Sequence, residues 1–196
     1  SNGIMRGKVL PADTLPKLIK EGILLPASVF GTDATGESVA ETGLVWDTGD
    51  RDYPFMPVAD SFHALDDEGK NIACLIQMME TDGTPHHLDP RGILEAVIAR
   101  INGMGIYPVI APELEFYLID RKLNDGMGQY APIPVTGEAQ PTNQIYGIEA
   151  FDEFSDIIND IHRSCLNAGV KADTAITEYG RGQYEINILH NKDALR

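Results

Sequence analysis

Two glutamates interrupt an otherwise apolar segment near the middle of the sequence. Glu113 and Glu115 alternate with Leu114, Phe116 and Leu118. A period of two is typical of a β-strand with two unlike faces. The strand rise then places both carboxylates on one side, roughly 7 Å apart. Like charges that close repel each other unless water, a cation or a shared proton relieves them.

A second stretch repeats this pattern near the end of the chain. Glu178 and Glu185 flank a glycine break, Gly180-Arg181-Gly182, and Glu185 lies within the period-two run 184–188. The acids of a surface strand are usually mixed with Lys, Thr or Gln, whereas these four stand in segments apolar enough for a core. The pattern favours a cage of carboxylates around a metal ion.

Carboxylate oxygens without a convergent His or Cys are the ligands of hard divalent cations such as Mg²⁺ or Mn²⁺. Such ions are typically shared between a few carboxylates and the phosphates of a nucleotide, so the set indicates phosphoryl transfer. Two alternatives stay open at this point. The glutamates are solvated residues on the face of a strand, or two of them form the acid and nucleophile of a glycosidase. A glycosidase needs only two carboxylates, with aromatic platforms beside them, and Trp46 is the single tryptophan.

Composition limits the class of protein. The net charge of −15 argues against a nucleic-acid partner, which would require a basic surface. No apolar run approaches the ~20 residues of a membrane span, and we expect neither a membrane partner nor a signal peptide. Cys74 and Cys165 lie far from any metal-binding spacing, which predicts two thiols in a reducing, cytoplasmic compartment.

The pattern of turn residues and apolar periods predicts an α+β protein of two domains, 1–88 and 89–196. Asp89-Pro90 is a strong helix start, with an acid at the N-cap and proline at the first helical position. The second domain would hold only about three strands with uncovered edges, so we expect it to be incomplete. The expected elements are strand 3–10, helix 15–21 capped by Thr14, strand 23–30, loop 31–54 with a short strand at 42–46, strands 58–62 and 72–79, helix 89–103, strand 111–118, loop 125–144, helix 151–167 and a closing hairpin over 177–189.

At these motifs the sequence resembles the glutamine synthetase superfamily, and within it the gamma-glutamylputrescine synthetase branch. The resemblance covers nearly the whole chain, because several separated motifs occur in the same order. The matching stretches are 2–8, 26–30, 49–52, 111–116 and 178–190.

The resemblance implies a β-grasp amino-terminal domain followed by a catalytic domain. It also implies a ligase that uses ATP to phosphorylate the side chain of L-glutamate, after which ammonia or an amine such as putrescine displaces the phosphate. Members of the family form large homo-oligomeric rings, so a homo-oligomer is expected.

The resemblance also implies roles for the four glutamates. Glu115, Glu178 and Glu185 would hold the first divalent ion, on the glutamate and amine side. Glu113 would help to hold a second ion against the ATP phosphates. Two dications would allow four carboxylates to lie close together and would also offset phosphate charge.

An aspartate in an amino-terminal loop of the family helps to bind ammonium. Asp47 is the candidate for this catalytic role, with Asp50 and Asp52 as alternatives. The usual Phe-Asp-Gly-Ser-Ser pattern is absent. His86-His87 is assigned no role and is interpreted as a pair of ordinary loop histidines.

The sequence lacks the family's later motifs, including a glycine-histidine loop and the phosphate-binding arginines. We therefore expect a fragment of the enzyme that is inactive by itself. The alternative is a non-catalytic truncated homologue that acts in assembly or regulation.

Overall fold

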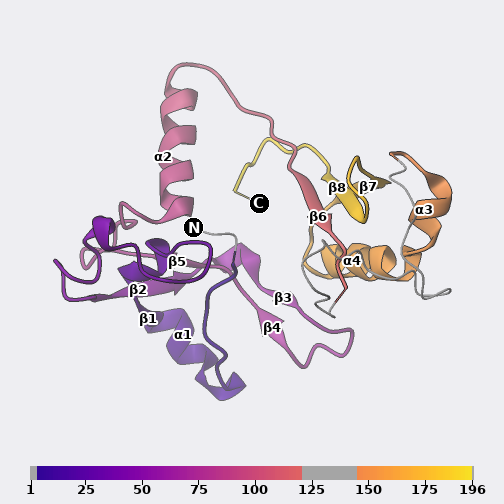
Figure 1. Cartoon of the computed structure of the whole chain (residues 1–196). Coiled ribbons are helices and arrows are strands. Elements are labelled where there is room, and N and C mark those ends of the chain that lie inside the picture. Colours follow the sequence, from indigo (N-terminus) through magenta and orange to yellow (C-terminus); the bar gives the residue numbers. More distant parts are fainter. Residues whose placement is uncertain (1–3, 121–144, 196) are drawn as a thin grey trace. The chain divides into compact units, whose positions relative to one another are not determined.

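The computed structural model describes residues 4–120 and 145–195 (Figure 1). It combines helices with antiparallel sheets, as expected for an α+β chain. The chain divides into two compact units. The first contains the residues up to Phe62, together with Ala73–Tyr107 and Leu195, and the second contains His63–Ile72 and Pro108–Ala194.

The first unit is built on a three-stranded antiparallel sheet in the order β1-β2-β5. Its strands are β1 (Ile23–Pro26), β2 (Asp52–Pro57) and β5 (Ile76–Met78). Phe55 lies opposite Ile23 on one side and Met78 on the other. Phe55, Met78 and Ala27 are buried together and form the small core of this unit.

Two helices belong to this unit. Helix α1 (Leu15–Glu21) ends at Gly22, as predicted. Thr14 precedes it without capping it, because its hydroxyl donates to the Pro11 carbonyl at 2.6 Å. Helix α2 (Pro90–Gly103) begins as predicted, with the Asp89 carboxylate accepting the Gly92 N–H at 2.8 Å.

Asp89 also joins α2 to the sheet. Its second oxygen accepts the Met78 N–H at 2.9 Å, and the residue is only 3% exposed. One buried carboxylate therefore satisfies two backbone donors, one in a strand and one in a helix.

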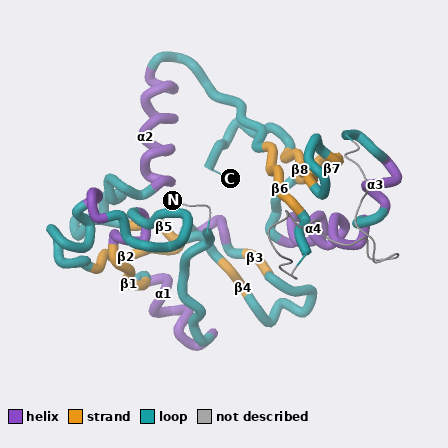
Figure 2. The backbone as a smooth tube through the Cα atoms, in the orientation of Figure 1, coloured by secondary structure: helices purple, strands orange, loops and turns teal. Residues whose placement is uncertain are grey.

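Several strands predicted in this unit are wrong. Residues 4–10 form no strand, and the region around 42–46 is a 3₁₀ turn (Ala40–Thr42) followed by further turns. Figure 2 shows how much of this unit is loop. The expected strand 23–30 stops at Pro26 and continues as a 3₁₀ helix (Ala27–Phe30).

The predicted strand 58–62 is also misplaced. The strand is β2, six residues earlier, and 59–61 form a 3₁₀ turn (Ala59–Ser61). Pro54 made a central strand improbable, because proline cannot donate to a ladder. In β2 its carbonyl still accepts the Met79 N–H at 2.8 Å. The segment 72–79 is divided between β4 (Ile72–Ala73), which pairs with β3 (His63–Ala64), and β5.

The second unit is built on a sheet in the order β6-β8-β7, with every neighbouring pair antiparallel. Its strands are β6 (Glu113–Tyr117), β7 (Ala172–Thr177) and β8 (Gln183–Ile188). Strand β6 was predicted. The closing hairpin was predicted in part: β8 lies within the expected range 177–189, but β7 ends where that range begins. The core of this unit consists of Phe154, Ile158, Tyr184 and Ile186.

The helix predicted at 151–167 is two helices, α3 (Ile148–Asp152) and α4 (Ser155–Asn167). Phe154 leaves the helical conformation between them, and its buried ring lies edge-on to Tyr184 at 5.8 Å between centroids. Helix α4 ends near Gly169, as predicted. The predicted loop 125–144 lies outside the described residues.

The β-grasp assignment and the boundary between residues 88 and 89 remain predictions. By their contacts, the residues of α2 belong with the first unit.

Candidate functional site

The register of the second sheet places three of the predicted glutamates on one face. Glu115 lies directly opposite Glu185, and Glu113 lies opposite Asn187. Glu178 follows β7, where its N–H donates to the Gln183 carbonyl at 2.9 Å and extends the pairing by one residue. Alternation along the strands therefore places Glu178 on the same face as Glu185. We call this surface, made of Glu113, Glu115, Glu178, Gln183, Glu185 and Asn187, the acid face.

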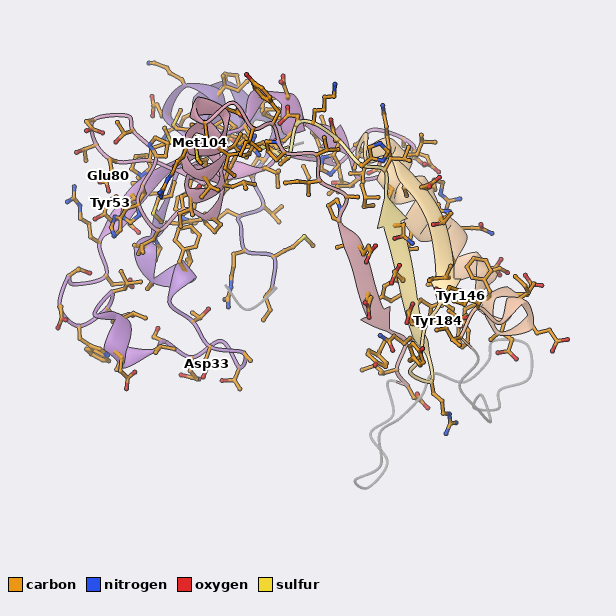
Figure 3. The ribbon with its side chains drawn as sticks, turned by 90° about the horizontal axis from the view of Figure 1, so that it is seen from above. Asp33, Tyr53, Glu80, Met104, Tyr146 and Tyr184 are labelled. Carbon is orange, nitrogen blue, oxygen red and sulfur yellow. The ribbon has the colours of Figure 1, made fainter. Side chains whose placement is uncertain are left out.

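The opposite face of the sheet carries the core. Leu114 pairs with Ile186 and Phe116 with Tyr184, and the two aromatic rings lie 6.1 Å apart. Tyr184, labelled in Figure 3, is 1% exposed and donates its hydroxyl to the Ala150 carbonyl at 2.9 Å. Helices α3 and α4 pack against this apolar face of the sheet. The acid face is therefore not part of the core and can carry charged side chains.

The glutamates of the acid face differ in exposure. Glu185 is only 8% exposed, Glu178 is partly buried, and Glu113 and Glu115 are exposed. A carboxylate on the middle strand with like charge opposite it is costly unless something compensates the charge. Glu185 is therefore the centre of the acid face.

Gln183 organises one end of the acid face. Its Nε2 donates to Glu115 Oε2 at 2.6 Å, while its Oε1 accepts from the Tyr117 hydroxyl at 3.0 Å and the Gly180 N–H at 2.7 Å. This amide holds the Glu115 side chain in one orientation. Sequence reasoning missed Gln183 and Tyr117, although both fall on the period-two face two residues from a glutamate.

The glycine break between β7 and β8 has a steric cause. Gly182 has φ +70°, and a Cβ there would lie 2.8 Å from the Leu118 carbonyl oxygen. The Leu118 N–H donates to the Gly182 carbonyl at 2.8 Å. This close approach fixes the end of β6 against the turn that separates Glu178 from Glu185.

The acid face offers only oxygen ligands, which suits the hard cations predicted for it. In the described part of the chain, however, the group of three ligand atoms that lie within 4.8 Å of one another is elsewhere, at Glu80, His86 and His87. The four glutamates share a face, but no three of them have carboxylate oxygens that all lie within 4.8 Å of one another. Their role as a metal site therefore stays a prediction.

The candidate ammonium residues belong to the first unit. Asp47 is exposed in a turn, where its N–H donates to the Gly43 carbonyl at 3.0 Å. Asp50 has φ +52°, and Asp52 begins β2. Nothing in their surroundings distinguishes a catalytic aspartate among the three, and the role stays a prediction.

Burial alters the pKa of two residues outside the acid face. Burial lowers the pKa of His86, and repulsion by His87 adds to the effect, while the carboxylates of Glu80 and Asp89 oppose it. Burial raises the pKa of the Cys74 thiol. Cys74 and Cys165 are both free thiols.

Within the described ranges, no helix has the length and apolar character needed to cross a bilayer.

Comparison with known proteins assigns the family. Residues 87–196, more than half of the chain and including the whole acid face, match the glutamine synthetase catalytic domain. The chain belongs to the glutamine synthetase family.

The relatives of this chain include a glutamine synthetase and a glutamate–isopropylamine ligase. The chain is 36% identical to gamma-glutamylputrescine synthetase PuuA of Escherichia coli, over 99% of this chain and 41% of the relative. It is 27% identical to the glutamate–isopropylamine ligase of a Pseudomonas species, over 100% of this chain and 42% of that protein. A glutamine synthetase of Pyrococcus abyssi matches at 27% over 97% of this chain and 38% of its own length. The chain thus spans about two fifths of these relatives.

Solved structures agree on the fold. A glutamine synthase homologue superimposes with a TM-score of 0.72 at 22% identity, covering 95% of this chain and 41% of that one. The ligand-free form of GmaS gives the same score and identity, covering 98% of this chain.

Proposed function

We propose that this chain carries part of the divalent-metal centre of an ATP-dependent ligase that joins glutamate to ammonia or an amine. The observation that carries the proposal is the placement of Glu115 opposite Glu185 on the acid face, inside the part of the chain that matches the family's catalytic domain. Glu178 and Glu113 flank this pair on the same face.

The chemistry of the acid face suits such a centre. Mg²⁺ or Mn²⁺ bound here would neutralise phosphate charge as phosphate is transferred from ATP to glutamate. Glu115, Glu178 and Glu185 would hold one ion and Glu113 would help to hold the other. Gln183 would keep Glu115 oriented by its 2.6 Å hydrogen bond, which limits the reorganisation needed for binding.

The substrates proposed are L-glutamate, ATP and either ammonia or an amine such as putrescine. The names of two relatives, a gamma-glutamylputrescine synthetase and a glutamate–isopropylamine ligase, support an amine. Asp47 is proposed as a contributor to the amine site, and a homo-oligomer as the active form.

We also propose that the 196 residues have no ligase activity by themselves, since they span about two fifths of the relatives' length. This coverage equally suits the second candidate, a non-catalytic homologue that acts in assembly or regulation. The two differ in whether the acid face still binds its metal.

The proposal is tested by ADP release with ATP, L-glutamate and a panel of ammonia, putrescine and isopropylamine. We expect no turnover from the purified chain, and turnover dependent on both glutamate and an amine from any longer protein that contains it together with the rest of a catalytic domain. Glu185→Gln should abolish this activity, and Glu149→Gln, at an exposed position of α3, should preserve it. Ligation by the 196 residues alone would contradict the proposal that this chain is inactive by itself. Full activity of Glu185→Gln would contradict the proposed role of the acid face in metal binding.

A further inference from the structure

A second group of metal-ligating side chains lies in the first unit, in the turn between β5 and α2. It consists of Glu80, His86 and His87, whose ligand atoms all lie within 4.8 Å of one another. Glu80 is labelled beside Tyr53 in Figure 3, and the Tyr53 ring meets the His86 ring edge-on at 4.5 Å. None of the three residues belongs to the acid face.

The distances in this group suit a shared ion better than a direct hydrogen bond. Glu80 Oε1 lies 3.6 Å from His86 Nε2 and 3.8 Å from His87 Nδ1. Both separations exceed those of a charge-assisted hydrogen bond, which run about 2.7–2.9 Å. Two ligand atoms bound at ~2.1 Å to one tetrahedral zinc-like ion are themselves about 3.4–3.6 Å apart.

The backbone already holds the three ligands near one another. The Glu80 N–H donates to the Thr84 carbonyl at 2.7 Å, and the His86 N–H donates to the Met78 carbonyl at 2.9 Å. Met79 and Pro85 form an isolated β-bridge between these two contacts. The turn is thus closed by its own hydrogen bonds, and an ion would find its ligands on a formed scaffold.

The burial of the group resembles an open metal site. His86 is 2% exposed, whereas the side chains of Glu80 and His87 are 36% and 74% exposed. Water could therefore complete the coordination of an ion on the His87 side. The Asp89 carboxylate lies outside this group and accepts the Met78 and Gly92 N–H groups instead.

We infer that Glu80, His86 and His87 form a binding site for a zinc-class divalent ion, separate from the Mg²⁺ or Mn²⁺ proposed for the acid face. Two imidazole nitrogens and one carboxylate oxygen suit Zn²⁺, Co²⁺, Ni²⁺ or Cu²⁺, whereas Mg²⁺ prefers oxygen alone. A bound ion would tie the end of β5 to the start of α2.

Metal binding would change one contact of His86. Its Nδ1 now accepts the Leu88 N–H at 3.2 Å, so the neutral ring carries its proton on Nε2. When an ion binds Nε2, the single ring proton moves to Nδ1. A protonated Nδ1 cannot accept a hydrogen bond, so the Leu88 N–H must then turn away. Ligand histidines usually donate the other nitrogen to an acceptor, and loss of such support typically weakens binding 10- to 100-fold. We therefore expect weaker binding than in a closed structural zinc site.

The test is calorimetric titration of the purified chain with ZnCl₂ in the presence of excess Mg²⁺. We expect one saturable site and at least tenfold weaker binding in His87→Ala and Glu80→Gln, which change an exposed and a half-buried side chain and should leave the fold intact by circular dichroism. His190→Ala removes another histidine and Glu149→Gln another glutamate, both at exposed positions outside the two candidate metal sites, and both should bind Zn²⁺ as the unaltered chain does. The Leu88 amide resonance should shift on Zn²⁺ addition, and not in His87→Ala at the same Zn²⁺ concentration.

Three results would overturn the inference: no saturable Zn²⁺ binding, equal affinity in His87→Ala and the unaltered chain, or equal weakening by His190→Ala and His87→Ala. None of them bears on the acid face, because its ligands and its preferred ions are different.

Discussion

Glu115 on β6 and Glu185 on β8 lie directly opposite each other on neighbouring antiparallel strands. Directly opposed residues have Cβ atoms only about 4.5–5.5 Å apart, and like charges in this position destabilise a sheet. Glu185 is also 8% exposed, which weakens the screening of its charge by water. The chain thus keeps an arrangement that costs stability, as proteins do at functional sites.

Glu185→Gln should therefore stabilise the chain in EDTA and reduce its response to Mn²⁺. The substitution keeps the shape of the side chain and removes the opposed charge, which is worth about 0.2–1 kcal/mol. The unaltered chain should gain about 2.7 kcal/mol when Mn²⁺ is at 100 times its Kd. Urea denaturation with and without Mn²⁺ measures both effects. Glu149→Gln serves as control, and a Glu185→Gln chain less stable than the unaltered one in EDTA would contradict the argument.

Gly182→Ala should destabilise the second unit, because the left-handed backbone costs a non-glycine residue about 1–2 kcal/mol and the new Cβ meets the Leu118 oxygen at 2.8 Å. Gly169 provides a matched control. It has φ +71°, and an added Cβ would meet nothing within 4 Å. Urea denaturation should show Gly182→Ala to be less stable than Gly169→Ala by at least ~1 kcal/mol, the part due to the clash. Equal losses would mean that the contact with Leu118 is unimportant.

Asp89→Ala should be among the most damaging polar substitutions in the first unit. It removes the cap of α2, worth ~1 kcal/mol, and leaves the buried Met78 N–H without its acceptor, worth about 1–3 kcal/mol. Asp89→Asn keeps one acceptor oxygen and should lose clearly less. Chemical denaturation followed by circular dichroism distinguishes them, and an Asp89→Ala chain as stable as Asp89→Asn would refute the double role of this carboxylate.

Asp66 should titrate below the ordinary aspartate value of 3.8. A hydrogen bond from the Asn71 side chain at 2.7 Å is the largest cause of its lowered pKa, the Lys70 N–H adds to it, and burial opposes it. A lowered pKa means that these contacts stabilise the turn at pH values above 3.8 and are lost as the pH falls through the folded value. In a carbon-13 NMR titration, Asn71→Ala should raise the Asp66 midpoint. Asp33, whose pKa is lowered chiefly by the Thr35 side chain, should not move.

Much of the acid face could be predicted from the sequence, because strand alternation is a local rule. The period-two runs around Glu115 and Glu185 predicted which residues share a face. The direct pairing of these two glutamates depends on register, which alternation does not determine. Gln183 was not predicted because its importance lies in hydrogen bonds to Glu115 and Tyr117 on β6, which is distant in the sequence.

The mispredicted elements of both units have a similar origin. Pro54 argued against a strand by its own chemistry, and the strand forms because both neighbours, β1 and β5, pair with the residues around it. The helix break at Phe154 is likewise tertiary, since the ring turns into the core against Tyr184. Glu80 and His86 lie close only because the 80–84 turn folds back, so sequence spacing showed nothing beyond a loop.

The acid face is tested most directly by calorimetric titration of the chain with Mn²⁺, using Glu115→Gln and Glu185→Gln as variants and His87→Ala as control. We predict saturable binding that is weakened at least tenfold in both glutamine variants and unchanged in His87→Ala. Saturable binding of equal strength in all four proteins would contradict the proposal that the opposed glutamates hold the metal.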